Sequence, residues 1–118
     1  MFNHEKFEAY NLAITYWEQA LRLIDQIPFG NSIIKEQLKR AAASISLNIA
    51  EGSGRNKNDD RKRFYAIARG SALECAAISD LIAKLEPGLK AETDRTKDIL
   101  HSIASILSAV ILKPRFCS

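Results

Sequence analysis

The chain has 118 residues, of which 47% are hydrophobic and 26% are charged, and its formal net charge is +3. This length suits a single domain with one core, and the balance is that of an ordinary globular protein. No apolar run is long enough to cross a bilayer and the first ten residues lack the layout of a secretion signal, so we expect a cytoplasmic protein.

The first stretch with helical apolar spacing covers about 4–26, and Asn3 before it is a suitable N-cap. Its apolar residues form two rows, one beginning at Phe7 and the other at Ala9. Two rows are more apolar surface than a solvent-facing bundle helix needs. We therefore expect that this helix is deeply buried or that its second face contacts another subunit.

The second predicted helix covers 32–51, after a break that contains Pro28. Gly52 follows it as the expected C-cap. Its run of small side chains at Ala41–Ser44 either lets a neighbouring helix approach closely or reflects the helix propensity of alanine. Glu51 faces the negative end of the helix dipole, which favours a pair with a nearby arginine over simple exposure.

The third predicted helix covers 59–86 and is ended by Pro87. Gly70 lies inside it at a cost of about 1 kcal/mol relative to alanine, and close contact with the second helix would explain that cost. The fourth predicted helix covers 92–112 and also carries a wide apolar stripe.

Four helices with short connections predict an all-α, antiparallel up-down-up-down four-helix bundle, and we assign the single domain to 1–118. The surplus apolar rows of the first and fourth helices predict self-association. A closed ring of subunits would bury them, because each subunit offers two different faces.

The sequence contains little that suggests catalysis or metal binding. Cys75 falls on an apolar seam, where an inert buried thiol is expected, and Cys117 falls in a predicted C-terminal tail. His4 and His101 have no nearby nucleophile, and no Glu-x-x-His or phosphate-loop motif is present. We therefore expect no catalytic residue, no metal and no cofactor.

Positive charge is concentrated in the middle of the chain. From Lys35 to Arg69 there are nine basic and four acidic residues, whereas the rest of the chain has eight basic and ten acidic residues. This asymmetry indicates either an anionic partner near the turn between the second and third helices or a basic surface that is merely solvated. The residues predicted to contact nucleic-acid phosphates are Lys39, Arg40, Arg55, Lys57, Arg61, Lys62 and Arg63.

A second set of polar residues on the same two helices is predicted to be structural. Its members are Asn48, Glu51, Arg69 and Glu74. Arg69 could serve packing, or it could form an ion pair with Glu51 or Glu74. A carboxylate pair of Glu51 and Glu74 is the only starting point for an enzyme, which is the least favoured alternative.

Two motifs in this region resemble those of the 23S rRNA intervening-sequence protein family. The first is Asn-Ile-Ala-Glu-Gly at Asn48–Gly52, followed by Arg55. The second is an aromatic residue followed by an Ala-x-Gly-Ser-x-x-Glu pattern, which matches Phe64, Ala68, Gly70, Ser71 and Glu74. The resemblance covers nearly the whole chain.

The resemblance implies a four-helix bundle that assembles as a homopentamer with a central channel. It also implies no enzymatic activity. A related branch, the accessory variability proteins of diversity-generating retroelements, binds nucleic acid and a partner reverse transcriptase. We therefore predict a non-enzymatic, oligomeric protein that binds RNA or DNA. The alternative is a protein-interaction scaffold that docks a partner such as a reverse transcriptase.

Overall fold

The computed structural model describes residues 2–113, which fold into four long α-helices and two short 3-10 helices. The α-helices are α1 (Glu8–Gln26), α2 (Ser32–Ser53), α3 (Asn58–Leu85) and α4 (Lys90–Ile111). The 3-10 helices are η1 (Asn3–Lys6) and η2 (Pro87–Leu89). These residues contain no strand, so the prediction of an all-α protein with four helices is confirmed for the described part of the chain.

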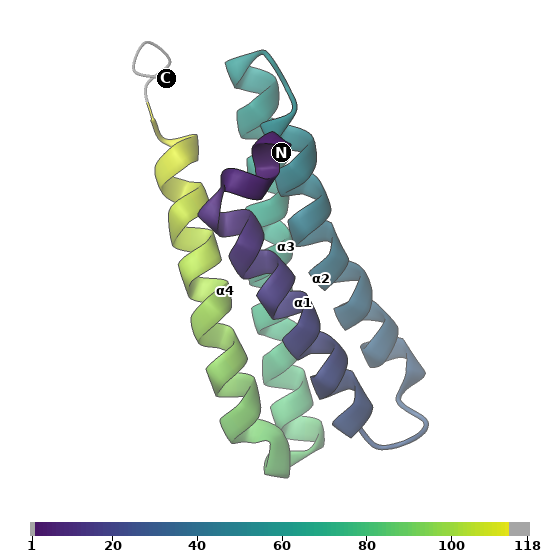
Figure 1. The fold of residues 1–118 in the computed structure, drawn as a ribbon. Helices are drawn as coiled ribbons and strands as arrows, with labels where there is room; N and C mark the ends of the chain where they lie inside the picture. Colours follow the sequence, from purple (N-terminus) through teal and green to yellow (C-terminus); the bar gives the residue numbers. More distant parts are fainter. Residues whose placement is uncertain (1, 114–118) are drawn as a thin grey trace.

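The helices form a rod of 49 × 21 × 21 Å, in which α1 and α3 each pack against both α2 and α4. The α1–α2 and α3–α4 connections lie at one end of the rod (Figure 1). The other end, which we call the hairpin end, holds η1, the α2–α3 turn at 54–57 and the last turn of α4 (Figure 1). Segments from the two ends and the middle of the chain therefore meet at the hairpin end.

The first predicted helix is interrupted at Phe7, so the prediction of one continuous helix over 4–26 is wrong. Phe7 has an extended backbone, with φ −88° and ψ 122°, which separates η1 from α1. The break brings the Phe7 ring to 5.5 Å from the ring of Tyr65 on α3. Asn3 forms no N-cap; its side-chain amide lies 3.5 Å from the Ser53 carbonyl oxygen on α2, at the limit of hydrogen-bond distance.

The end of α2 also differs from the prediction, because Gly52 lies inside the helix and Gly54 is the C-cap. A Cβ at Gly52 would come within 2.8 Å of the Tyr65 ring and 3.1 Å of the Phe64 Cβ. Glycine is therefore needed here for the close approach of α3, and not for a left-handed cap.

Close contact between α2 and α3 also occurs at mid-helix, but not at the predicted glycine. A Cβ at Gly70 would meet nothing within 4 Å, so the expectation that this glycine admits α2 is wrong. Instead, the Ser44 and Ser71 hydroxyls lie 2.8 Å apart across the two helices. The run of small residues at Ala41–Ser44 thus does allow a near approach.

The apolar rows of α1 and α4 are largely used within a single chain. The α1 row that begins at Ala9 is buried, and the row that begins at Phe7 is half-buried, as are the outer apolar residues of α4. These two helices therefore leave part of an apolar row uncovered in a single chain, although less of it than the two full rows suggested. Within the helices, the exposed large hydrophobic side chains lie on α2 and α3, and they are Ile33, Leu47, Ile67, Leu73, Leu81 and Leu85.

The core contains a few polar groups. Cys75 is fully buried, as predicted, and burial raises the pKa of its thiol to about 12. Cys117 lies outside the described residues. Burial also raises the pKa of the Tyr16 hydroxyl above its ordinary value.

None of the described helices is long and apolar enough to cross a membrane.

Candidate functional site

The structure divides the seven predicted nucleic-acid-binding residues into two groups. Five lie at or next to the α2–α3 turn, and we call them the basic end: Arg55, Lys57, Arg61, Lys62 and Arg63. Lys39 and Arg40 lie on α2, roughly 20 Å along the helix from its last residue, Ser53, at the usual rise per residue. Both are exposed, and Arg40 forms an ion pair with Glu36 at 3.2 Å.

The backbone of the α2–α3 turn is held by short-range hydrogen bonds. The Gly54 amide donates to the carbonyls of Ala50 and Glu51, which satisfies the end of α2. The Arg61 guanidinium then donates to the Arg55 carbonyl at 2.9 Å, which ties the first turn of α3 back to the loop. Lys57 is the N-cap of α3 and its side chain is exposed. The turn therefore presents its basic residues from a closed backbone.

Two of these arginines lie against the same aromatic ring. The Arg55 and Arg63 guanidinium carbons are 4.8 Å and 4.5 Å from the centroid of the Phe64 ring. Such cation–π contacts are worth roughly 0.5–1 kcal/mol at exposed sites. Arg55 also pairs with Glu51 at 2.8 Å, as predicted for that glutamate, although both side chains are partly exposed. The two guanidinium groups are thus oriented before any ligand arrives.

The same turn contains buried N–H donors that no described residue accepts. These atoms are Arg55 Nε, Asn58 Nδ2 and Arg61 Nε. Buried polar atoms are nearly always hydrogen-bonded in native proteins, so three unpartnered donors at one turn are unusual. Because each atom has almost no exposed surface, these donors show that the turn is incompletely satisfied, and they do not by themselves form a ligand site.

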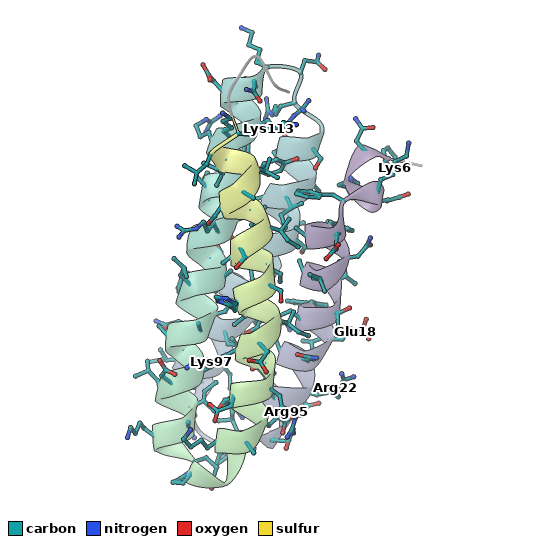
Figure 2. All side chains as sticks on the ribbon, turned by 90° about the vertical axis from the view of Figure 1, so that its left-hand side faces the viewer. Lys6, Glu18, Arg22, Arg95, Lys97 and Lys113 are labelled. Carbon is teal, nitrogen blue, oxygen red and sulfur yellow. The ribbon has the colours of Figure 1, made fainter. Side chains whose placement is uncertain are left out.

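Two more lysines, Lys6 and Lys113, lie at the hairpin end, and sequence reasoning missed both. The carbonyl of Lys113 accepts a hydrogen bond from Lys62 Nζ at 2.5 Å, which places the end of α4 beside the start of α3. Figure 2 shows Lys6 and Lys113 at this same end. Both are far from the basic stretch in sequence, and only the predicted helix directions could have placed them here.

Acidic residues partly offset this charge. Glu51 pairs with Arg55, and Asp59 and Asp60 lie in the first turn of α3, where negative charge is favoured by the helix dipole. The basic end therefore has a moderate net positive charge, and its arginine side chains are held in defined positions.

The structure does not bring together the four residues predicted as a structural polar cluster. Asn48 donates to the Ser44 carbonyl at 2.8 Å and to its hydroxyl at 3.0 Å, within α2. Arg69 Nε donates to Ser108 Oγ on α4 at 2.6 Å and does not reach either glutamate. Glu74 is exposed. Arg69 therefore joins α3 to α4, whereas Ser44 and Ser71 join α2 to α3.

Neither histidine belongs to the basic end, although His4 lies near the end of α2 and lines a pocket with Glu51 and Gly54. The His4 ring is 4.6 Å from the Tyr10 ring, and His101 is exposed on α4. Among residues 2–113, no group of three or more His, Cys, Asp or Glu residues is arranged to hold a metal ion.

Comparison with known proteins agrees with the two motifs in α2 and α3. No curated protein gives a significant match to the chain. The family model for the 23S rRNA-intervening sequence protein matches residues 5–109, which is most of the 118-residue chain and includes all four helices except the last residues of α4. On this match, together with its four-helix fold, the chain belongs to the 23S rRNA-intervening sequence protein family.

Proposed function

We propose that this chain is a non-enzymatic nucleic-acid-binding protein that contacts RNA or DNA phosphates through the basic end. The observation that supports it is the arrangement of five cationic side chains around one turn, with Arg55 and Arg63 held over the Phe64 ring. Guanidinium and ammonium groups contact phosphates without reading base sequence. The expected binding is therefore strong at low salt and broad in sequence.

One turn alone offers few phosphate contacts, so we propose that several chains act together. The unit is an up-down-up-down bundle, and the assembly is a ring-like homo-oligomer, for which the family resemblance suggests a pentamer. The apolar side chains exposed on α2 and α3 support self-association, because a monomer leaves them in water. A ring would repeat the basic end around one rim and raise the avidity for a long strand.

A salt titration with a matched pair of variants tests the nucleic-acid proposal. One variant replaces Arg55, Lys57, Arg61 and Arg63 with alanine. The control replaces four other cations, and these are Arg22, Lys35, Lys84 and Arg95. Two of them, Arg22 and Arg95, are seen near the opposite end of the rod in Figure 2. Both variants lose the same charge, and circular dichroism checks that both remain helical.

We expect the basic-end variant to lose about 100-fold in affinity for a single-stranded oligonucleotide at low salt. The slope of log K against log salt should become shallower by roughly 0.7 for each phosphate contact removed. The control variant should keep most of the affinity. Absence of binding at low salt, or an equal loss in both variants, would contradict the proposal.

The second candidate is a scaffold that docks a partner protein such as a reverse transcriptase, and an apolar groove favours it. Ile33 and Ile34 of α2 and Leu81 and Leu85 of α3 line a groove of about 410 Å³ near the opposite end of the rod. A Leu81→Asp variant distinguishes the two uses of this groove. Light scattering should show a smaller mass if the groove joins copies of this chain. An unchanged mass with loss of a copurifying partner would favour the scaffold.

A further inference from the structure

A pocket at the hairpin end combines two cations with neutral hydrogen-bond donors. It has a volume of about 350 Å³ and is bounded by η1, the end of α2, the start of α3 and the end of α4. The Lys6 and Arg61 side chains line it, together with the polar residues Asn3, Ser53 and Tyr65. No carboxylate is among the described residues that line this pocket, so its formal charge is positive.

The hydroxyls of Ser53 and Tyr65 leave one hydrogen available to a ligand. The two oxygens are 2.9 Å apart, and both side chains are almost fully buried. A pair of hydroxyls has two O–H donors, of which only one is used between them. The remaining hydrogen needs an acceptor, and the pocket is the open space beside the pair.

The other polar groups of the pocket are also donors. The Asn3 amide has two N–H groups, and only one of them is directed at the Ser53 carbonyl. Arg61 uses one terminal nitrogen for the Arg55 carbonyl, which leaves other terminal N–H groups of the same guanidinium for a ligand. The Lys6 ammonium forms no hydrogen bond or ion pair with a described residue. Four donor groups therefore surround one open site.

We propose that this pocket binds a phosphomonoester dianion. A phosphate group presents several acceptor oxygens in a tetrahedral arrangement, which suits donors that converge from η1, α2 and α3, and its double negative charge matches the two cations. The Phe7 and Tyr65 rings form an apolar wall beside the donors, against which the carbon skeleton of the ligand can lie. A pocket of this volume is within the range of small-ligand sites. The proposal does not rest on nucleic-acid binding, because a free phosphomonoester satisfies the same groups.

Nuclear magnetic resonance of the full chain tests the pocket directly, with adenosine monophosphate and inorganic phosphate as probes at low salt. We expect saturable shifts in the amide signals of Ser53 and Tyr65. Lys6→Ala should weaken adenosine monophosphate binding about tenfold, the usual effect of losing one charge-assisted hydrogen bond. Lys84→Ala removes the same charge at the opposite end and should leave the binding unchanged.

Arg61 requires a second variant, because its contact with the Arg55 carbonyl also supports the turn. Arg61→Gln should weaken adenosine monophosphate binding at least as much as Lys6→Ala, whereas Arg61→Lys should retain part of it. Shifts that do not saturate, or that are the same in Lys6→Ala and in the wild-type protein, would overturn the proposal.

Oligonucleotides then identify the source of the phosphate. If the pocket holds a strand end, a 5′-phosphorylated oligonucleotide should bind more tightly than its 5′-hydroxyl twin, and the difference should vanish in Lys6→Ala. Binding of free adenosine monophosphate without that difference would assign the pocket to a small phosphomonoester. Phosphate binding with no oligonucleotide binding at all would preserve the pocket and remove the nucleic-acid proposal.

Discussion

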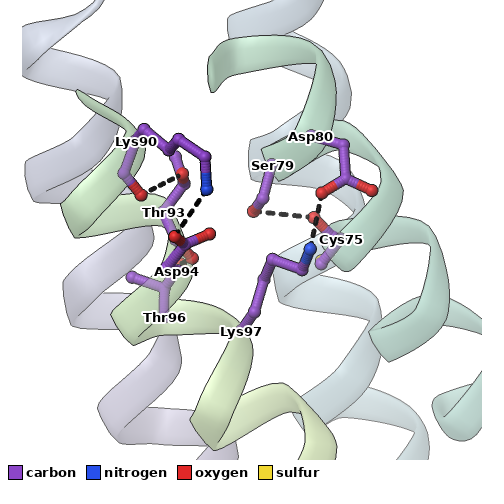
Figure 3. A network of polar contacts seen from close by, with 8 residues as sticks. All are labelled: Cys75, Ser79, Asp80, Lys90, Thr93, Asp94, Thr96 and Lys97. Atoms are coloured by element: carbon purple, nitrogen blue, oxygen red, sulfur yellow. Dashed lines mark hydrogen bonds and ion pairs between the residues drawn. The ribbon is translucent and has the colours of Figure 1, made fainter. Parts of the chain in front are cut away.

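The two ends of the rod differ in how their polar side chains are partnered. At the opposite end, Lys97 pairs with Asp80 at 2.6 Å and Lys90 pairs with Asp94 at 2.8 Å (Figure 3). The buried hydroxyls nearby donate to carbonyls one helical turn earlier, as Thr93 does to Lys90. Ammonium groups and hydroxyls in this network therefore find their partners within the chain.

At the hairpin end, cations contact backbone carbonyls or an aromatic ring more often than carboxylates. Lys62 and Arg61 donate to carbonyls, and Arg63 lies over Phe64. Three buried donors there have no partner among the described residues. The comparison therefore concerns two local networks: Lys90, Asp94, Lys97 and Asp80 pair with one another, whereas several donors at the α2–α3 turn have no partner among the described residues. A charge that is neutralised internally supports the fold, whereas one that is positioned but not neutralised is available to an anion.

The largest effect on stability is expected from Gly52→Ala at the hairpin end. The new Cβ would lie 2.8 Å from the Tyr65 ring, so either this buried ring must move or α2 and α3 must shift apart. We expect a loss of about 1–3 kcal/mol in the free energy of unfolding, measured by urea denaturation. Gly70→Ala is the matched control, because nothing lies within 4 Å of its Cβ, and it should gain about 0.5–1 kcal/mol from helix propensity. A stable Gly52→Ala protein would show that this contact can relax without cost.

A smaller effect is expected from Tyr65→Phe, which removes one partner of the buried hydroxyl pair. Ser53 Oγ would be left without its partner at 2.9 Å, and we expect a loss of about 1–2 kcal/mol. The double variant Ser53→Ala/Tyr65→Phe removes both groups and should cost less than the sum of the two single changes. A double-mutant cycle by urea denaturation measures this coupling. Additive losses would mean that the two hydroxyls act independently.

The helices could be predicted because their cause is local. Apolar spacing located all four, and the bounds of α3 and α4 differ from the expected ones by two residues or fewer. The roles of the two glycines could not be predicted in this way: Gly52, expected as a C-cap, lies inside α2 against Tyr65, and Gly70, expected to contact α2, has no neighbour within 4 Å of its Cβ. Which of them faces a neighbour depends on the rotation of each helix in the bundle, which the sequence pattern leaves open.

The candidate site could be predicted only in part. The basic stretch identified the turn, because Arg55, Lys57 and Arg61 are close in sequence. Lys6 and the break at Phe7 could not be found this way, since their partners on α2 and α3 are about 50 residues away or more. The pocket is therefore formed by tertiary packing, and of the residues that line it the charge pattern alone predicted only Arg61.

A still smaller effect on the free energy of unfolding is expected from Tyr16→Phe, which removes a buried hydroxyl. The Tyr16 hydroxyl is buried close enough to Cys75 and Ser79 for them to influence its pKa, but it forms no hydrogen bond of ordinary geometry with the described residues. Removing an unpartnered buried hydroxyl should leave the free energy of unfolding unchanged or raise it by up to about 1 kcal/mol. Urea denaturation of Tyr16→Phe and Tyr65→Phe in parallel compares the cost of removing an unpartnered hydroxyl with that of removing a paired one. A loss as large as that of Tyr65→Phe would reveal a bonded partner, such as an internal water molecule.

The smallest effect is expected in the exposed ion pair at the opposite end. The hydrogen bond from Lys90 lowers the pKa of the Asp94 carboxyl below its ordinary value. Because the folded-state pKa is below the unfolded one, the pair contributes stability above the unfolded pKa of about 3.9 and loses that contribution as the pH falls through the folded value. Carbon-detected magnetic resonance titration of Asp94 should show the lowered pKa, and Lys90→Ala should move it back toward the ordinary value. Lys84→Ala removes another exposed lysine and should leave it unchanged. If Lys90→Ala has no effect, this end is less fully paired than its geometry indicates, and the contrast between the two ends would depend on the Lys97–Asp80 pair and the buried hydroxyls.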